Sequence, residues 1–314
     1  MKRLIAAFLL STSLAFGVVQ PIAHSQQQVM RRPITSGSSA PAFPTISTTW
    51  AWYEPARETG YSDGDGISPL TDQSGNSRNW TNTGTTASRP QFQINQLNSL
   101  AVANGNHASN SGWDTGPNMS GLTAVHAFMV VLAAADPAGD LGQTGLWNVG
   151  NDANSEHIPY VNGLLYSDAF STTRHDGMGH TLNLASTYRL LEWVSTSSEW
   201  TLKINGTETV LTTGTNTVGC PSSPTLLTAS GASSRHKLAF LYISSAKLGS
   251  TDRTALIDYI NNRFGTTFAV NTKRDWIPSI YAYLHISNYQ GAGAALSGSL
   301  NLRRRAAESV IMTL

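Results

Sequence analysis

The stretch Asp72-Gln73-Ser74-Gly75-Asn76 indicates the fold more clearly than any other part of the sequence. Upstream of it lie Trp52-Tyr53 and the loop 60–66, Gly-Tyr-Ser-Asp-Gly-Asp-Gly. Far downstream, the apolar run 238–244 is followed by 248–265, which ends in Tyr-Ile-Asn-Asn-Arg-Phe-Gly. Asp, Asn, Ser and Gly side chains of this kind favour tight turns. The pattern therefore predicts short strands joined by compact loops, with one helix near the end.

These segments together resemble the opening and closing motifs of the concanavalin A-like, laminin-G-like jelly-roll domains of secreted bacterial and phage proteins. Such domains typically open with an aromatic strand and an Asp-Gly-Asp loop, continue with Asp-x-Ser-Gly-Asn, and close with a strand and a helix. The resemblance covers residues 48–268. It implies an all-β fold, a two-sheet antiparallel jelly-roll sandwich with one C-terminal helix packed on it. It says little about the ligand, because the family is defined by its scaffold.

The sequence divides into four predicted segments. Residues 1–25 have a basic start, an apolar run and small residues at Ala23 and Ser25, as in a secretory signal peptide. The run is too short and interrupted for a membrane span, which needs about 20 apolar residues. Residues 26–48 are rich in Ser, Pro and Gly and predict a linker or arm. The β domain is predicted at 49–268 and a C-terminal extension at 269–314. We expect a secreted or cell-surface product.

The composition excludes several classes of partner. Only 12% of the residues are charged and the net charge is +1. The composition therefore gives no sign of the basic surface that would attract nucleic acids or anionic membranes. The single cysteine, Cys220, rules out an internal disulfide framework. We expect it to be a partly buried structural thiol.

Three local patterns predict secondary structure. Apolar residues alternate over 122–133 and 188–194, which predicts strands, the first with Val125, Ala127, Met129 and Val131 on one face. Alternation on both sides of Asn205-Gly206 predicts a β-hairpin, since both turn residues accept positive φ. Over 250–265 the apolar spacing predicts a helix, with Ser250 or Thr251 as its N-cap and Gly265 as its left-handed C-terminal residue.

The C-terminal extension has no counterpart in the resembled family. Residues 276–287 alternate as a strand would, and Arg303-Arg304-Arg305 precede an apolar end. Three arginines are too few for a nucleic-acid site. The extension is interpreted either as a weakly packed tail or as a docking element for assembly partners.

A hydrolase of the type found on this scaffold requires paired carboxylates. Retaining glucanases need two carboxyl groups about 5 Å apart, and glucanases on this scaffold take them from one Glu-x-Asp-x-x-Glu run. The chain has no such run: Glu192 and Glu199 stand alone on their strands, and Glu156 lies in an expected loop. We therefore expect a non-catalytic protein, with a polysaccharide-degrading enzyme as one alternative.

Asp63, Asp65 and Asp72 form a candidate metal site. Carboxylate oxygens are the ligands that calcium prefers, and the resembled fold commonly holds a structural Ca²⁺ through loop oxygens. The same Asp-Gly pairs also serve simply as turns, so both interpretations stay open. The segment 175–180, His-Asp-Gly-Met-Gly-His, matches no helical zinc motif and is interpreted as a polar surface loop.

Sugar binding needs an aromatic platform for the apolar face of a pyranose and a few polar groups for its hydroxyls. Trp193 and Trp200 lie on alternating patterns and are predicted core residues. For Trp147 and Tyr160 both the core and the platform role stay open. The candidate ligand-binding residues are Trp113, Asp114, Trp147, Asn148, Asn151, Asp152, Tyr160, Tyr166, His175 and His180.

The sequence favours a secreted, non-catalytic carbohydrate-binding or adhesion module whose partner is a surface polysaccharide or other glycan. A structural or decoration protein of a virion or cell surface, which merely displays the jelly roll, is the first alternative.

Overall fold

The computed structural model describes residues 40–105, 112–133, 145–150, 156–160, 162–229 and 232–269. The chain divides into two units, Met1–Pro41 and Ala42–Leu314, and the second is described below. The predicted signal peptide, Asn151, Asp152 and the C-terminal extension beyond Ala269 lie outside the described residues.

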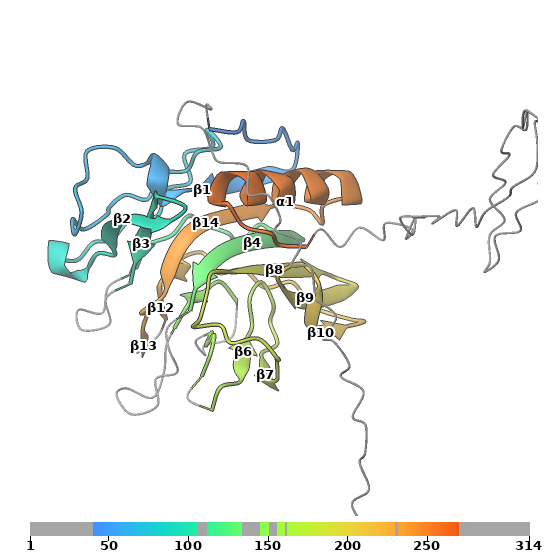
Figure 1. Cartoon of the computed structure of the whole chain (residues 1–314). Helices are drawn as coiled ribbons and strands as arrows, with labels where there is room; N and C mark the ends of the chain where they lie inside the picture. Colours follow the sequence, from blue (N-terminus) through green and yellow to red (C-terminus); the bar gives the residue numbers. More distant parts are fainter. Residues whose placement is uncertain are drawn as a thin grey trace, which may run out of the picture. The chain divides into compact units, whose positions relative to one another are not determined.

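An eight-stranded antiparallel sheet is the main element of this unit (Figure 1). Its strands follow the order β10-β9-β8-β4-β14-β3-β2. Strand β14 pairs with β4 along one edge, and its other edge pairs with β3 near Lys237 and with β1 near Ser244. The strands are β1 (Thr49–Tyr53), β2 (Gln91–Leu97), β3 (Leu100–Asn104), β4 (Val125–Leu132), β8 (Arg189–Thr196), β9 (Glu199–Ile204), β10 (Glu208–Thr213) and β14 (Lys237–Ser244).

Both faces of the main sheet are buried. Successive side chains of a strand point to opposite faces, and in β4 they enter two separate hydrophobic clusters. Phe128 belongs to the cluster on one face. The other face carries the residues predicted from the sequence, namely Val125, Ala127, Met129 and Val131. The sheet is therefore the middle layer of this unit.

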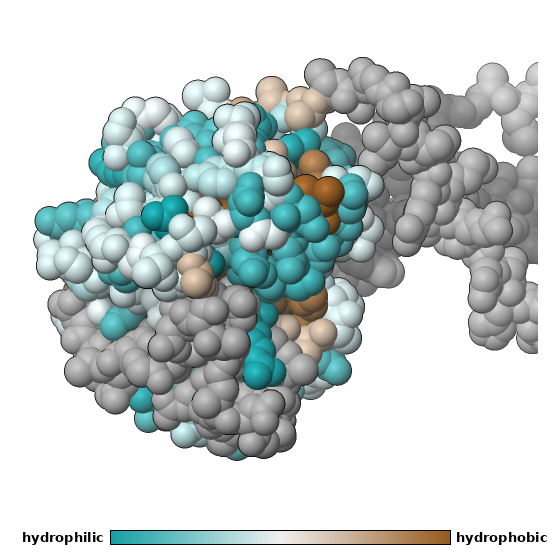
Figure 2. All heavy atoms as spheres, turned by 90° about the vertical axis from the view of Figure 1, so that its left-hand side faces the viewer, coloured by the Kyte–Doolittle hydropathy of each residue, from teal (hydrophilic) through white to brown (hydrophobic). Residues whose placement is uncertain are grey.

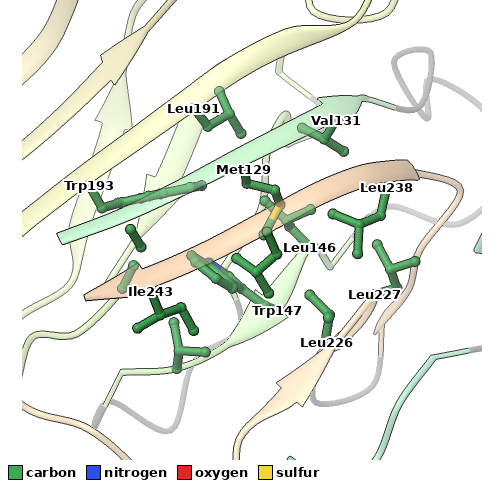
Figure 3. Close-up of a cluster of buried hydrophobic side chains, with 14 of the residues drawn as sticks. Met129, Val131, Leu146, Trp147, Leu191, Trp193, Leu226, Leu227, Leu238 and Ile243 are labelled. Carbon is green, nitrogen blue, oxygen red and sulfur yellow. The ribbon is translucent and has the colours of Figure 1, made fainter. Parts of the chain in front are cut away.

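A layer of short strands packs against the face that carries Met129. In Figure 3 Trp147 and Leu226 of this layer lie against Met129, Trp193 and Ile243 of the main sheet. The layer consists of three two-stranded sheets, and with the main sheet it forms the predicted antiparallel jelly-roll sandwich. Its strands are β5 (Trp147–Asn148), β6 (Leu165–Ser167), β7 (His175–Met178), β11 (Thr225–Leu226), β12 (Thr228–Ala229) and β13 (Ala232–Ser233).

Helix α1 (Ser250–Phe264) covers the opposite face of the main sheet and buries Leu256, Ile260 and Phe264 against it. Gly265 ends the helix at φ 63°, in the predicted left-handed conformation. The predicted N-cap was wrong. The helix begins one residue earlier, Gly249 occupies the N-cap position, and no side chain caps the first turn.

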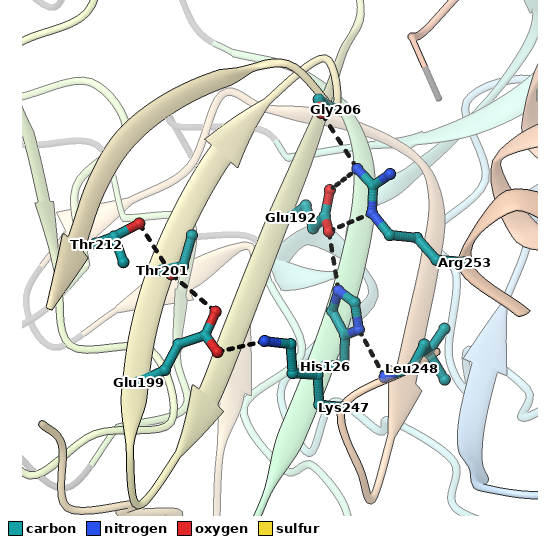
Figure 4. A network of polar contacts seen from close by, with 9 residues as sticks. All are labelled: His126, Glu192, Glu199, Thr201, Gly206, Thr212, Lys247, Leu248 and Arg253. Carbon is teal, nitrogen blue, oxygen red and sulfur yellow. Dashed lines mark hydrogen bonds and ion pairs between the residues drawn. The ribbon is translucent and has the colours of Figure 1, made fainter. Parts of the chain in front are cut away.

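A buried polar network joins α1 to the sheet (Figure 4). The Arg253 guanidinium donates to both carboxylate oxygens of Glu192, at 2.7 and 2.6 Å. His126 Nδ1 accepts from the Leu248 backbone N–H at 3.0 Å, so Nε2 carries the proton and donates to Glu192. Burial acts to raise the pKa of Glu192, but the hydrogen bonds from Arg253 and His126 outweigh it and lower the pKa to about 2. Every polar atom of this carboxylate therefore has a partner.

The predicted hairpin joins β9 to β10. Asn205 and Gly206 form its turn with φ of 54° and 75°, which confirms the prediction. Arg253 Nη2 also donates to the Gly206 carbonyl at 3.2 Å. This hydrogen bond fixes the turn to α1. A second contact fixes it to the chain after the helix, because the Ala269 N–H donates to Asn205 O at 3.1 Å.

The Asp72–Asn76 motif fastens β1 to the rest of the fold. The Asp72 carboxylate accepts from the backbone N–H groups of Trp52, Ser74 and Arg78 at 2.9–3.2 Å, and also from the Ser74 hydroxyl. The Asn76 amide donates to Trp50 O at 3.0 Å. These contacts satisfy backbone groups on the outer edge of β1. They explain why this motif indicates the fold and not a ligand.

Packing begins upstream of the predicted domain start at Thr49. The Phe43 ring stacks on Trp52 with ring centroids 4.2 Å apart and planes inclined by 4°. Ile46 is buried in the same cluster. The predicted linker therefore contributes its last residues to the core beside α1.

The described surface is mainly polar. Figure 2 shows a face that is largely hydrophilic with small apolar spots, and Ile94 is the one large hydrophobic side chain that the described residues expose. In the part of the chain described, no helix has the length and apolar character needed to cross a membrane. Cys220 is buried, and burial raises the pKa of its thiol to about 12. The described surface therefore offers mainly polar groups and partly exposed aromatic rings.

Candidate functional site

A tight turn in the short-strand layer brings two of the predicted tyrosines together. Tyr160 and Leu164 close the turn through the hydrogen bond from Tyr160 N to Leu164 O, at 2.8 Å. Asn162 Oδ1 accepts from Leu164 N at 3.0 Å, and Gly163 supplies the positive φ of 75°. The chain then returns through β6, where Tyr166 and His157 exchange two backbone hydrogen bonds.

The aromatic rings on this turn form a row of tilted contacts. The rings of His157 and Tyr160 lie 5.1 Å apart, and those of Tyr160 and Tyr166 lie 4.9 Å apart. The Arg174 guanidinium covers the Tyr166 ring at 5.1 Å from its centroid, and Asn162 Nδ2 donates to the Tyr166 hydroxyl at 2.8 Å. We name Tyr160, Asn162, Tyr166 and Arg174 the tyrosine surface.

The tyrosine surface is partly exposed. Both tyrosines are half-buried and Asn162 is exposed. Arg174 is 19% exposed and forms an ion pair with the 63% exposed Asp176, at 2.7 Å. An exposed pair of this kind contributes little stability, but it offsets the positive charge beside Tyr166. The surface thus combines fixed rings with a nearly neutral set of hydrogen-bonding groups.

The predicted histidines lie along β7 and just beyond it. The His175 ring packs on the buried Trp200 ring with centroids 4.1 Å apart, and burial lowers the pKa of His175 although Asp176 opposes this. His180 is half-buried after the end of β7. The contact from this segment to the tyrosine surface comes from Arg174, the residue before His175, which lies over the Tyr166 ring.

Two of the predicted platform residues are core residues. Trp113 and Trp147 are fully buried, and Trp147 contacts Trp193 and Phe170 at ring separations of 4.7 and 5.3 Å. Neither ring presents a face to solvent. Of the two roles left open for Trp147, the structure shows the core role, and the candidate ligand-binding role of Trp113 is corrected to a core role. The prediction that Trp193 and Trp200 are core residues is confirmed.

The remaining predicted ligand residues lie apart from the tyrosine surface. Asp114 binds the Thr83 N–H and hydroxyl at 3.0 and 2.7 Å, and these hydrogen bonds, with that of Thr115, outweigh burial and lower its pKa. Asn148 pairs with Thr225 between β5 and β11. Asn151 and Asp152 lie outside the described residues.

The three predicted metal ligands do not gather. Asp63 accepts from Ile94 N at 3.0 Å, Asp65 accepts from Ser62 N at 2.6 Å, and Asp72 is engaged in the β1 contacts described above. Among the described residues no group of three or more His, Cys, Asp or Glu side chains is placed to hold a metal ion. Of the two interpretations left open by the sequence, these contacts support that of turn residues, because each aspartate serves its own turn.

Sequence reasoning missed Asn162 and Arg174 in the tyrosine surface. Arg174 follows two threonines and carries no local signal, and only the pairing of β6 with β7 brings it over Tyr166. Glu156 lies in a loop, as expected, and is fully buried, where it accepts a hydrogen bond from the Ser167 hydroxyl.

No protein-family model and no curated protein matches the chain. Similar solved structures include a Trypanosoma rangeli sialidase, with 8% identity over 72% of this chain and 34% of that chain and a TM-score of 0.43. Domain 4 of an extracellular arabinanase from Geobacillus stearothermophilus, in complex with arabinotriose, shares 15% identity over 68% of this chain and 98% of its own, with a TM-score of 0.47.

The botulinum neurotoxin serotype D binding domain shares 11% identity over 68% of this chain and 51% of its own, with a TM-score of 0.42. The chain spans only about a third of the length of the sialidase that it matches, namely 34%. Similarity at this level does not identify a ligand for the present chain.

Proposed function

We propose that the chain is a non-catalytic carbohydrate-binding or adhesion module that recognises a surface polysaccharide through the tyrosine surface. The observation that carries this proposal is the half-exposed pair of Tyr160 and Tyr166, with rings 4.9 Å apart. Asn162 donates a hydrogen bond to the Tyr166 hydroxyl, and the Arg174 guanidinium lies over the Tyr166 ring.

The chemistry of a sugar matches this arrangement. A pyranose has an apolar face of C–H groups and a rim of hydroxyls, so it needs a rigid ring and nearby hydrogen-bonding groups. Tyrosine supplies rigid contact area at little entropic cost, and the fixed contacts of Tyr166 reduce that cost further. The Asn162 amide and the Arg174 guanidinium are suited to bind sugar hydroxyls.

The positions of the carboxylates favour binding over hydrolysis. Glycosidases place two carboxyl groups on either side of the bond that they break. Glu156 and Asp168 are 0% and 1% exposed, so neither reaches a substrate from solvent in this structure. Glu192 is buried under Arg253 on the other side of the sheet.

The proposal also includes family and location. The Asp72–Asn76 motif and the β14–α1 ending support membership of the concanavalin A-like, laminin-G-like jelly-roll domains, in which such motifs fasten the first strand and close the sandwich. The predicted signal peptide supports a secreted or cell-surface location.

The test is binding of the purified protein to an array of polysaccharides and glycans, in calcium buffer. We expect at least one specific signal, reduced tenfold or more by Tyr160→Ala or Tyr166→Ala. Tyr61→Ala is the matched control. Tyr61 is also half-buried, but it lies in another loop, where its ring packs against Phe92 of β2. A blank array from a folded protein, or equal signals from all variants, would overturn the proposal.

A further inference from the structure

The chain's own loops cover the outer edges of β2 and β1. Phe92 of β2 accepts from the Gly64 N–H and donates to the Asp65 carbonyl, at 2.7 Å each. On β1, the Trp52 N–H donates to the Asp72 carboxylate at 3.2 Å. Unpaired backbone groups at the edge of a sheet can pair with a further strand. Both loops therefore close edges that would otherwise be open to such pairing.

Strand β10, at the other end of the sheet, has no such cover among the described residues (Figure 1). In that part of the chain its backbone pairs with β9 alone. Its single charged side chain, Glu208, already accepts from the N–H and hydroxyl of Thr181, at 2.9 and 3.2 Å. The register shifts after Thr209, but the pairing with β9 is regular from Leu211 on. Val210 and Leu211 are only half-buried. The edge is therefore open, almost uncharged and partly apolar.

The part of the chain described ends at Ala269, beside the start of this edge. The Ala269 N–H donates to Asn205 O at 3.1 Å, and its backbone lies against Gly206. Strand β10 begins two residues later. The six residues that follow, 270–275, span at most about 20 Å, which is roughly the length of a strand of six residues. The segment that comes next can therefore reach every part of the β10 edge.

That segment, 276–287, has the composition of a strand that suits this edge. Positions 276, 280, 282, 284 and 286 are Trp, Ile, Ala, Leu and Ile, and the segment contains no Asp, Glu, Lys or Arg. Pro278 lies near its start, where an edge strand tolerates proline. We propose that residues 276–287 pair with β10 of the same molecule as a further, parallel strand of the main sheet.

The path of the chain gives the direction of this strand. Because Ala269 lies at the Glu208 end of β10, a segment that continues from there along the edge runs the same way as β10. Parallel neighbours need a connection of about a dozen residues or more, and residues 214–275, with β14 and α1, supply it. The added strand would bind the outward N–H and C=O groups of β10 and prevent association through this edge. The proposal does not depend on sugar binding.

Hydrogen exchange of the backbone amides tests the proposal in the full chain, because amides in a strand ladder exchange slowly. We expect peptide 207–214 to exchange at least tenfold faster in the double variant Ile280→Pro, Tyr281→Pro. Successive N–H groups of a strand point to opposite edges, so one of the two prolines must remove a hydrogen bond to β10.

The matched control is the double variant Ile311→Pro, Met312→Pro, which should exchange as the wild type does. The Phe92 amide of β2 should be equally slow in all three proteins, which shows that each is folded. Equal exchange of peptide 207–214 in the wild type and the first variant would overturn the proposal.

Disulfide cross-linking identifies the partner independently. The single cysteine, Cys220, is buried, so cysteines introduced in pairs can react with each other. Thr212→Cys, at an exposed position of β10, is combined in turn with Ser279→Cys, Tyr281→Cys and Tyr283→Cys. We expect at least one pair to form a disulfide within one molecule, and none to do so when Gln96→Cys of β2 replaces Thr212→Cys. Cross-linked dimers would assign the edge to a second copy and overturn the proposal, as would the absence of any cross-link.

Discussion

The two faces of the main sheet treat buried polar groups differently. On the α1 face, Glu192 is held by Arg253 and His126, and Glu54 is held by Arg57, Arg263 and Tyr259. On the opposite face, Trp113 Nε1, Trp147 Nε1 and Glu156 Oε2 have no hydrogen-bond partner in the part of the chain described, whereas on the α1 face the Tyr188 hydroxyl is such an atom.

This difference separates a face that fixes the fold from one that is available for function. Satisfied buried networks give rigidity and a unique arrangement. Unfilled buried acceptors and half-exposed rings are costly for stability, and such features concentrate at functional sites. The α1 face therefore carries the satisfied polar networks, and the short-strand layer carries the surface for which we propose recognition.

Removal of Arg253 should have the largest effect on the α1 face. Arg253→Ala leaves Glu192 buried without its main partner, which should lower the free energy of unfolding by about 3–5 kcal/mol. Urea denaturation measures this value. Lys247→Ala is the control, because Lys247 pairs with Glu199 near the surface and should cost less than about 1 kcal/mol. Equal losses in the two variants would remove the distinction between the networks.

Substitution of Trp147 should be comparably severe in the other layer, but for a different reason. Trp147→Ala empties a core position and should cost about 3–5 kcal/mol of unfolding free energy. Tyr166→Ala, on the half-exposed surface, should cost about 1 kcal/mol. Chemical denaturation of both variants checks this. If the Trp147→Ala protein were as stable as the wild type and had lost only ligand binding, Trp147 would belong to the binding site and not to the core.

Acid should weaken the α1 face through Glu192. Its folded-state pKa of about 2 lies below the usual 4.5, so its contribution is full above pH 4.5 and is lost as the pH falls toward 2. The loss should be on the order of 3 kcal/mol. Denaturation of wild type and Glu192→Gln at several pH values measures it. The variant should show a flatter dependence over this window, and identical slopes would argue against the assigned network.

The hairpin turn should give the smallest of these effects. Gly206 has φ 75° and lies against the Ala269 backbone, so Gly206→Ala should cost at least about 1 kcal/mol. Gly214→Ala, where nothing lies within 4 Å of the added Cβ, should stay within about 0.5 kcal/mol. Thermal melts of the two variants test the pair. A Gly206→Ala protein as stable as Gly214→Ala would show that the turn tolerates a side chain.

The sequence predicted the fold well wherever a local pattern carried it. The alternation of β4, the Asn205-Gly206 turn and the β14–α1 ending each depend on neighbouring residues, and the structure confirms them. The helix N-cap was wrong because Gly249 precedes two residues that are themselves good caps.

The site was harder to predict, because tertiary packing decides it. Trp147 lies in a strand of two residues, too short for alternation to show that its ring points into the core. Arg174 reaches Tyr166 only through the pairing of β6 with β7. Glu156 is fully buried beside Ser167, a residue 11 positions further along the chain. Tyr160 and Tyr166 were found because aromatic residues beside amides are a recognisable composition.

Calorimetric titration of the strongest glycan found on the array, against wild type, Tyr166→Ala and Tyr61→Ala, tests the central claim most directly. The account predicts at least a tenfold loss of affinity for Tyr166→Ala, less than a twofold change for Tyr61→Ala, and folded protein in every case. Equal affinity of wild type and Tyr166→Ala would contradict it and would place recognition away from the tyrosine surface.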